Sequence, residues 1–130
     1  VKEAVSKLKE AGYLLAVASS SPTDVIEETL NVLDVRDCFQ SITSGREVAE
    51  PKPAPDIFLR AMEKLGVSPQ ECLIIEDSTN GGKAAKAAGA KCVWYHNPDS
   101  GDQNIPYAEL EIGEWNAENV NKLIQIMKEN

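Results

Sequence analysis

A short apolar run that ends in two adjacent carboxylates constrains this chain more than any other stretch. Residues 72–75 read Cys-Leu-Ile-Ile, and Glu76 and Asp77 follow directly, before a turn-like Ser-Thr-Asn-Gly-Gly segment. An apolar run of this length, closed by turn residues, predicts a buried parallel strand. Ligands in open α/β sheets bind beyond the carboxyl ends of such strands. Glu76 and Asp77 are therefore expected at a functional edge of the sheet.

Two like charges at a strand end are costly unless something compensates them, and a divalent cation with oxygen ligands does so well. The pair is thus a candidate metal site. The ordinary alternative is that these acids start a turn and cap the next helix, because acidic residues suit a helix N-terminus. Polar residues elsewhere in the chain help to decide between a metal site and a helix cap.

The rest of the chain alternates between predicted strands and predicted helices. Apolar runs predict strands at 13–18, 39–43, 72–75 and 91–95, with a weaker one at 110–112. Helical spacing of apolar residues covers 1–11, 22–33, 56–65, 81–88 and the segment from Asn116 onward. This alternation predicts an α/β fold with a doubly wound parallel sheet. A length of 130 residues corresponds to one domain, 1–130.

Composition narrows the function classes. The formal charge of −8, from 13 basic and 21 acidic residues, argues against an extended nucleic-acid or anionic-membrane surface. No apolar run approaches the roughly 20 residues that a membrane-spanning helix needs. The three cysteines form no CxxC pair, which is typical of reduced thiols in a cytosolic protein. We therefore expect a cytoplasmic protein that binds neither nucleic acid nor membrane.

Three groups of polar residues are expected to converge at the sheet edge. They are the hydroxyls of residues 19–21, the amine of Lys52, and the carboxylates of Glu76 and Asp77. Together, a hydroxyl donor, a cation and a metal-binding acid pair describe a phosphoryl site, where donors and cations stabilise negative charge spread over several oxygens. The serines and the lysine also have ordinary alternatives, as the acid pair does. The serines would cap a helix, and the lysine would be a solvated surface residue.

Other reactive residue types have simpler explanations. His96, the single histidine, has no partner within sequence reach and is expected near the rim of the site rather than as a general base. Cys72 lies inside an apolar strand and is expected to be inert. Trp94 and Trp115 are expected to be packing residues and not a stacking platform for a ligand.

Three segments, in this order and spacing, resemble the haloacid dehalogenase (HAD) superfamily. They are residues 14–21, residues 52–58 (Lys-Pro-Ala-Pro-Asp-Ile-Phe) and residues 73–81 (Leu-Ile-Ile-Glu-Asp-Ser-Thr-Asn-Gly). The similarity runs from Val1 to about Pro98 and is strongest to the β-phosphoglucomutase-like and phosphoglycolate-phosphatase-like branch. The resemblance implies a Rossmann-like core domain that uses Mg²⁺ and acts on a small phosphorylated metabolite.

The resemblance also implies a role for each candidate residue. Ser19 would be the second-motif hydroxyl that binds the transferring phosphoryl group, helped by the backbone amide of Ser20. Lys52 would be the third-motif lysine, which neutralises the phosphoryl oxygens and the nucleophile. Asp77 and Glu76 would hold Mg²⁺, with Asp77 the foremost ligand. Gly82 departs from the family, where an apolar residue usually stands, and this touches packing more than chemistry.

The main departure is an absence. The family's first motif, a DxD whose leading Asp is the phosphorylated nucleophile, has no match in this chain, and neither has the helical cap that selects substrates. The chain thus resembles the C-terminal part of the core domain. In the family the nucleophile strand lies between the strand ending at Ser19 and the one ending at Asp77. We hypothesise that the full protein supplies it; otherwise the two strands pair directly or a second chain fills the gap.

The leading functional expectation is part of a Mg²⁺-dependent HAD phosphatase that acts through an aspartyl-phosphate, with sugar phosphates among the candidate substrates. The 130-residue chain alone is then expected to be inactive. A sugar-phosphate mutase is the alternative, although it needs a second, largely cap-borne phosphate site. A dehalogenase would leave the acid pair without a purpose. A non-catalytic HAD-like binding or regulatory domain stays open, whereas phospho-receiver domains have their acids and lysine in the reverse order.

Overall fold

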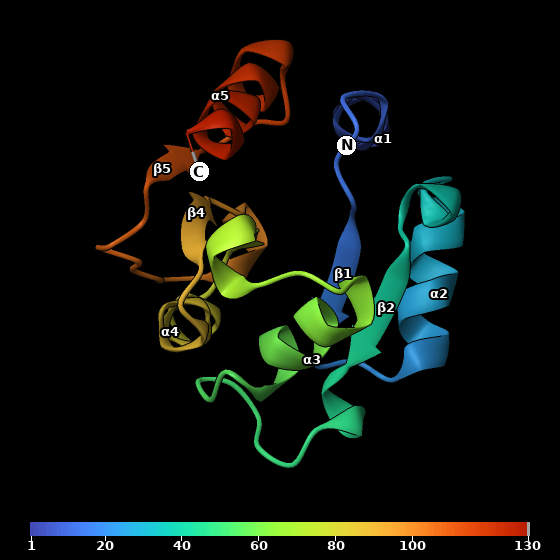
Figure 1. Ribbon diagram of the computed structural model, residues 1–130, viewed down its shortest axis with the longest axis vertical. Helices are drawn as coiled ribbons and strands as arrows, with labels where there is room; N and C mark the ends of the chain where they lie inside the picture. Colours follow the sequence, from blue (N-terminus) through green and yellow to red (C-terminus); the bar gives the residue numbers. More distant parts are fainter. Residues whose placement is uncertain (130) are drawn as a thin grey trace.

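The computed structural model describes residues 1–129, in which helices and strands alternate as expected. The strands are β1 (Ala16–Ser19), β2 (Ser41–Ser44), β3 (Leu73–Glu76), β4 (Lys91–Tyr95) and β5 (Leu110–Ile112). The helices are α1 (Lys2–Glu10), α2 (Thr23–Val32), α3 (Asp56–Leu65), α4 (Thr79–Ala88) and α5 (Ala117–Lys128). Figure 1 shows these elements in chain order, from α1 in blue to α5 in red.

Local signals explain where most elements begin and end. Gly66 and Gly89 follow α3 and α4 with φ of +70° and +84°, a backbone conformation that suits glycine at a helix end. Asn116 is the N-cap residue of α5, and its side chain accepts a hydrogen bond of 2.8 Å from the amide of Asn119. Helix α4 begins at Thr79, two residues before the expected start, because Ser78 caps it by accepting from the Gly81 amide at 3.0 Å.

The hydrogen-bonded strand pairs within residues 1–129 are all parallel, which confirms the predicted sheet type. Strand β1 pairs with β2, with Ala16 opposite Ser41, while β4 lies between β3 and β5. Within the described residues, no hydrogen-bonded pairing joins β1 to β3, so the sheet is divided into β1-β2 and β3-β4-β5. In Figure 1 these parts stand on the right and on the left of the molecule. Direct pairing of the two strands, one of the expected alternatives, is therefore not what this structure adopts.

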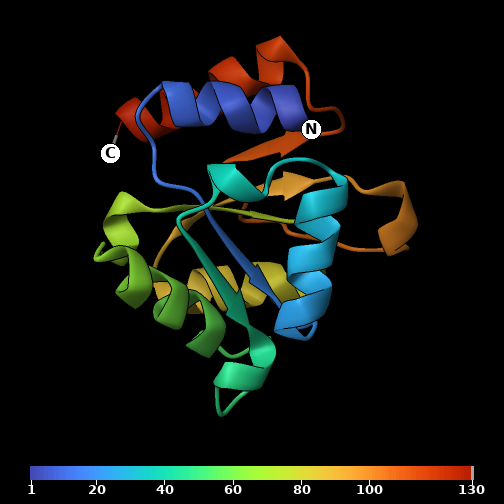
Figure 2. The ribbon, with the colours of Figure 1, turned by 90° about the vertical axis from the view of Figure 1, so that its right-hand side faces the viewer.

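Helices cover both faces of the divided sheet, as a doubly wound fold requires. On one face α3 and α4 pack against alternate strand residues, among them Ala18, Ile74 and Cys92. On the other face α2 packs against Val17 and Ile42, and α5 packs against Val93 and Ile112, with α1 contributing Val5 and Leu8. Figure 2 shows α1 lying beside α5, although they come from opposite ends of the chain. Successive residues of β1 and β4 thus serve opposite faces.

The two strands that flank the division are less buried than expected. Residues 72–75 were predicted to form a strand buried on both faces, but Leu73 and Ile74 are only half-buried and Ile75 is 37% exposed. All four residues of β1 are likewise half-buried. By contrast, Cys92 and Val93 of β4 are 3% and 0% exposed. The prediction is wrong for Ile75, because β3 has no neighbouring strand on its side of the division.

The departure at Gly82 has a packing explanation. A Cβ placed at Gly82 would lie 2.9 Å from two carbons of Ile105, which is 1% exposed. Ile105, from the long segment between β4 and β5, thus occupies the space that a side chain on α4 would need. This agrees with the expectation that the change concerns packing. None of the helices among residues 1–129 has the length and apolar character to cross a lipid bilayer.

Candidate active site

Lys52 and Glu76 form an ion pair at the carboxyl end of β3. The Lys52 Nζ lies 2.6 Å from Glu76 Oε2, and the two side chains are only 15% and 9% exposed. The same amine lies 4.9 Å from the centre of the Phe58 ring. The interpretation of Lys52 as a solvated surface lysine is therefore wrong. Desolvating two charges largely offsets their attraction, so such a pair is poor evidence of stabilisation and a better pointer to a functional site.

The Glu76 carboxylate lies against the first turn of α4. A Cβ placed at Gly81 would come within 2.1 Å of Glu76 Cδ, so the carboxylate occupies space that exists only because residue 81 is glycine. Its Oε1 also accepts a hydrogen bond of 3.2 Å from the Asp77 amide. A carboxylate at a helix N-terminus is favoured by the helix dipole. Glu76 is thus directed toward Lys52 and α4.

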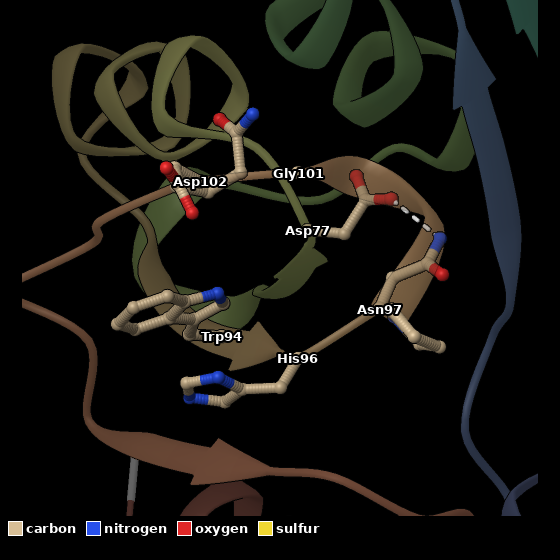
Figure 3. Close-up of a pocket in the computed structure, with 8 residues that line it drawn as sticks. Asp77, Trp94, His96, Asn97, Gly101 and Asp102 are labelled. Atoms are coloured by element: carbon tan, nitrogen blue, oxygen red, sulfur yellow. Dashed lines mark hydrogen bonds between the residues drawn. The ribbon is translucent and has the colours of Figure 1, made fainter.

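The Asp77 carboxylate is held from the segment that follows β4. Its Oδ2 accepts from Ser100 Oγ at 2.6 Å and from Asn97 Nδ2 at 3.0 Å, the latter drawn in Figure 3. Burial by itself would raise the pKa of the Asp77 carboxyl, but the hydrogen bonds from Ser100 and Asn97 outweigh it and hold that pKa below its usual range. Asp77 is therefore a carboxylate at neutral pH. Since Ser78 caps α4, the capping explanation for Glu76 and Asp77 is not supported.

The three serines form a turn of their own at the end of β1. The Ser21 amide donates to Ser19 Oγ at 3.2 Å, and the Ser21 carbonyl accepts from Ser44 Oγ at 2.6 Å. Helix α2 begins at Thr23, and its N-cap residue, Pro22, supplies no side-chain cap, so the helix-capping explanation for these hydroxyls is not supported. Ser20 and Lys52 line one small cavity of about 140 Å³, which brings the turn beside the lysine.

The expected site residues are thus linked through shared contacts. Ser20 shares a cavity with Lys52, Lys52 pairs with Glu76, and Glu76 accepts from the amide of Asp77. Ser19 lies in the same turn as Ser20. This arrangement places hydroxyls, an amine and two carboxylates at the carboxyl ends of β1 and β3, where ligands of parallel α/β sheets bind.

Asp77 and Glu76 are the predicted metal ligands, and they stand next to each other at the carboxyl end of β3. Across residues 1–129 there is no group of three or more His, Cys, Asp or Glu side chains placed to hold an ion. Mg²⁺ does not need one, because it commonly keeps several waters and takes one or two carboxylates plus substrate phosphate oxygens. The donor set therefore fits a Mg²⁺ ion that takes its remaining ligands from water, substrate or other protein groups.

A cavity of about 530 Å³ opens beside Asp77. Figure 3 shows Trp94 and His96 on its lower side in that view, with Asp102 and Asp77 opposite. The two aromatic rings stack with centroids 4.0 Å apart, and His96 Nε2 lies 2.8 Å from Glu111 Oε1 on β5. His96 therefore has a partner, which sequence proximity did not reveal. Trp94 packs as expected, against His96 and against the core cluster under α3 and α4.

The other secondary expectations agree with the structure. Trp115 packs against Tyr95, with ring centroids 5.4 Å apart. Cys72 lies directly before β3 and not inside it. Burial nevertheless raises the pKa of its thiol, with the nearby Glu71 charge adding to the effect, as expected for an unreactive cysteine.

Two residues of the site, Asn97 and Ser100, were not predicted from the sequence. Both donate to Asp77 from more than 19 positions away along the chain. The available signal was their place just beyond β4, since the carboxyl ends of adjacent parallel strands meet at one edge of the sheet. An amide and a hydroxyl there were candidates to contact the acid at the end of β3.

Comparison with known proteins places the chain in a family. Residues 1–95 match the haloacid dehalogenase-like hydrolase family. The chain is 40% identical over 106 residues to hexitol phosphatase B of Escherichia coli (strain K12), covering 82% of this chain and 47% of the relative. It is 32% identical over 131 residues to the phosphorylated carbohydrates phosphatase of Thermotoga maritima, covering 99% of this chain and 58% of the relative.

The fold comparison agrees. The crystal structure of CbbY from Rhodobacter sphaeroides in complex with phosphate superposes with a TM-score of 0.80 at 31% identity, over 87% of this chain and 52% of the other. The chain spans about half the length of the curated relatives it matches. The family match includes Ser19, Lys52, Glu76 and Asp77, and by its extent the chain belongs to the haloacid dehalogenase-like hydrolases.

Proposed function

We propose that this chain carries the phosphoryl-binding and metal-binding groups of a Mg²⁺-dependent phosphatase for small phosphorylated metabolites, sugar or sugar-alcohol phosphates in particular. The observation that carries the proposal is the secluded Lys52–Glu76 pair directly beside Asp77, at the carboxyl end of a parallel strand. The names of the two relatives, a hexitol phosphatase and a phosphorylated carbohydrates phosphatase, support this substrate class.

In this proposal Ser19 and Lys52 hold the phosphoryl group. The Ser19 hydroxyl and the Ser20 amide would donate to its oxygens, and the Lys52 amine would neutralise the charge that spreads over them in the transition state. Glu76 holds that amine in place through the 2.6 Å contact. The lysine then needs little reorganisation when the substrate arrives, which is the source of electrostatic catalysis.

Asp77 and Glu76 would hold the Mg²⁺ ion. When bound, such an ion supplies positive charge at a phosphoryl oxygen and orients the substrate. The Asp77 carboxylate is ionised at neutral pH for the reasons given above, so it is ready to bind a cation without losing a proton.

The nucleophile would come from outside the described residues. An aspartyl-phosphate route needs an Asp on a strand, and the division between β1 and β3 offers two unpaired parallel edges between which a further parallel strand would complete the sheet. The exposure of Ile75 beside this division supports such an occupant. A strand there would end between Ser19 and Asp77. We propose that the longer protein supplies it, together with the substrate-selecting cap.

The proposal places the enzyme in the cytoplasm, where thiols stay reduced. Cys38, Cys72 and Cys92 are all free of disulfide bonds in the structure. An obligatory disulfide in the purified protein would argue against this location.

The test is Mg²⁺-dependent release of phosphate from hexitol and hexose phosphates, measured on the full-length protein and on the 130-residue chain. We expect activity from the full-length protein only, abolished by chelation of divalent cations. Lys52→Ala and Ser19→Ala should each lower kcat at least 100-fold, whereas Lys83→Ala, on the exposed side of α4, should not. Turnover by the short chain would disprove the external nucleophile, and an inactive full-length protein would favour a binding or regulatory domain.

A further inference from the structure

We propose that Asn97 and Ser100 are positioning residues that make Asp77 a one-oxygen metal ligand and thereby favour Mg²⁺ over Ca²⁺. This inference rests on the proposed function, because it takes Asp77 to be a metal ligand. Asn97 and Ser100 lie in the segment after β4, outside the residues that would bind the phosphoryl group or the metal ion directly.

The first observation is that both donors end on the same oxygen. Ser100 Oγ and Asn97 Nδ2 lie 2.6 Å and 3.0 Å from Asp77 Oδ2. Among residues 1–129, no hydrogen bond from the side chains of this segment reaches Oδ1. Because both donors converge on one oxygen, turning the carboxylate away from this orientation would break both bonds, while a full half-turn only exchanges two equivalent oxygens. The arrangement thus engages one carboxylate oxygen and leaves the other without a side-chain donor from this segment.

The second observation is that the Asn97 amide cannot easily be reversed. Its Oδ1 accepts a hydrogen bond of 3.0 Å from the Asp99 amide, which identifies the other atom, Nδ2, as the one that faces Asp77. Reversal would set an NH₂ group against the Asp99 N–H and an oxygen against the carboxylate. The Ser100 amide also donates to the Asn97 carbonyl at 3.1 Å, which joins both donors in one tight turn.

The third observation is that this turn is anchored to Thr79, the first residue of α4, just after Asp77. Gln103 accepts from the Thr79 amide at 2.7 Å and donates to the Ser100 carbonyl at 2.8 Å. The Asn104 amide donates to Thr79 Oγ1 at 2.9 Å. Thr79 lies two positions after Asp77, so the donors and the acceptor belong to one hydrogen-bonded frame. Figure 3 shows the Asn97 and Asp77 side chains facing each other, joined by their hydrogen bond.

Ion selectivity follows from how the two cations use carboxylates. Ca²⁺ accepts six to eight oxygen ligands in flexible geometry and often takes both oxygens of one carboxylate. Mg²⁺ requires near-ideal octahedral geometry and is served by one well-placed oxygen with waters. An Asp77 whose Oδ2 is engaged by Asn97 and Ser100 suits the second ion. Removing either donor frees Oδ2 and lets the carboxylate turn, which penalises Mg²⁺ and relieves the restriction on Ca²⁺.

The test measures binding of Mn²⁺ to the full-length protein by electron paramagnetic resonance, and displacement of Mn²⁺ by Mg²⁺ and by Ca²⁺. Asn97→Ala and Ser100→Ala should weaken Mg²⁺ binding by about 10- to 100-fold, the usual effect of losing a partner of a metal ligand. Both should lower the ratio of the Ca²⁺ Kd to the Mg²⁺ Kd by about tenfold or more. Ser100→Thr keeps the hydroxyl and should retain the wild-type ratio.

The matched control is Asp102→Asn, which changes another carboxylate of the same cavity that makes no hydrogen bond to Asp77. It should leave the ratio unchanged. Thermal unfolding without metal separates selectivity from folding: if Asn97→Ala fails to fold, Ser100→Ala decides, since it removes one hydroxyl from a surface turn. A lower Tm with an unchanged Ca²⁺ to Mg²⁺ ratio in the alanine variants would overturn the inference.

Asp77→Asn distinguishes this inference from the proposed function. If Asp77→Asn leaves Mn²⁺ binding intact, Asp77 is not a metal ligand and the metal part of the proposed function fails. If Asp77→Asn abolishes binding while Asn97→Ala and Ser100→Ala bind all three ions as the wild type does, the proposed function stands and the positioning role is wrong.

Discussion

Lys52 Nζ lies 2.6 Å from Glu76 Oε2, with both side chains largely withdrawn from water, although 24 positions separate them in the chain. The contact joins the loop before α3 to the carboxyl end of β3. It therefore couples the position of the proposed phosphoryl-binding cation to the position of the proposed metal site. A substitution at Lys52 or Glu76 is therefore expected to shift the position of the other side chain.

Removing one partner of this pair should destabilise the protein strongly. Lys52→Met or Glu76→Gln leaves an uncompensated charge in a poorly hydrated position, at a cost of about 3 kcal/mol in the free energy of unfolding. The double variant removes both charges and should recover most of that loss, because neither buried charge is then left without its partner. Urea unfolding of the four proteins in the absence of metal provides the measurement. Purely additive single effects would contradict the coupling.

Gly81→Ala should destabilise the protein although alanine is the better helix former. The added Cβ would meet Glu76 Cδ at 2.1 Å, and the carboxylate must leave its place beside α4. We expect a net loss of about 1–3 kcal/mol, against a propensity gain of up to about 1 kcal/mol. Glu76→Asp, whose side chain is one methylene shorter, should reduce the penalty of Gly81→Ala. Thermal unfolding measures both, and a stabilised Gly81→Ala variant would show that Glu76 moves aside freely.

Ile75→Lys should change self-association in the 130-residue chain and fold stability in the full-length protein. In the 130-residue chain Ile75 is 37% exposed beside an unpaired strand edge, so a lysine should reduce self-association through that edge. In the full-length protein the proposed additional strand would bury this position, and the same change should destabilise the fold. Val32→Lys, at an 80% exposed position on α2, is the control and should have little effect in either form. Sedimentation and thermal unfolding together test the prediction, which fails if the full-length protein tolerates Ile75→Lys.

Cys92 should resist thiol reagents until the protein opens. Burial, aided by the charge of Glu76, raises the pKa of the Cys92 thiol to about 11 from an ordinary value of 9.0. At pH 8 it is almost wholly protonated and should react with iodoacetamide far more slowly than a free thiol. Mass mapping of the alkylated cysteines gives the result, with the urea-unfolded protein as the reference. Fast labelling of native Cys92 at pH 8 would contradict its burial.

Ionisation of the Cys92 thiol is expected to lower the stability of the protein at alkaline pH. Because the folded-state pKa lies above the unfolded-state pKa, the folded protein holds the proton more tightly. The contribution to stability is complete below about pH 9 and declines as the pH rises toward 11. Cys92→Ala should remove this part of the pH dependence, at the cost of a small cavity. Urea unfolding at pH 8 and pH 10.5 for both proteins tests the sign.

Prediction from the chain succeeded where the determining interactions are local. The bounds expected for α3, β4 and β5 agree with the structure, because apolar spacing and glycines such as Gly66 act over a few residues. The burial of Ile75 was predicted wrongly, since burial depends on which strand lies alongside. The start of α4 was expected two residues too late, since Ser78 rather than an acid or a glycine makes the cap.

The candidate residues Ser19, Ser20, Lys52, Glu76 and Asp77 were named from the sequence through their strand-end positions and their resemblance to family motifs. Their partners were not. Pairing of Lys52 with Glu76, and of Asp77 with Asn97 and Ser100, depends on contacts between distant segments. The roles of the five candidates stay predictions until the variants above are measured.

Local sequence determined the class of fold, the order of its elements and the residue types available for phosphoryl and metal chemistry, because helix, strand and turn preferences act between near neighbours. Tertiary structure determined which of those residues meet. It set Lys52 against Glu76, engaged one oxygen of Asp77 by two donors, and left β1 and β3 with unpaired edges on either side of a division. Such outcomes depend on packing and strand pairing across the whole chain, which no short window of sequence contains.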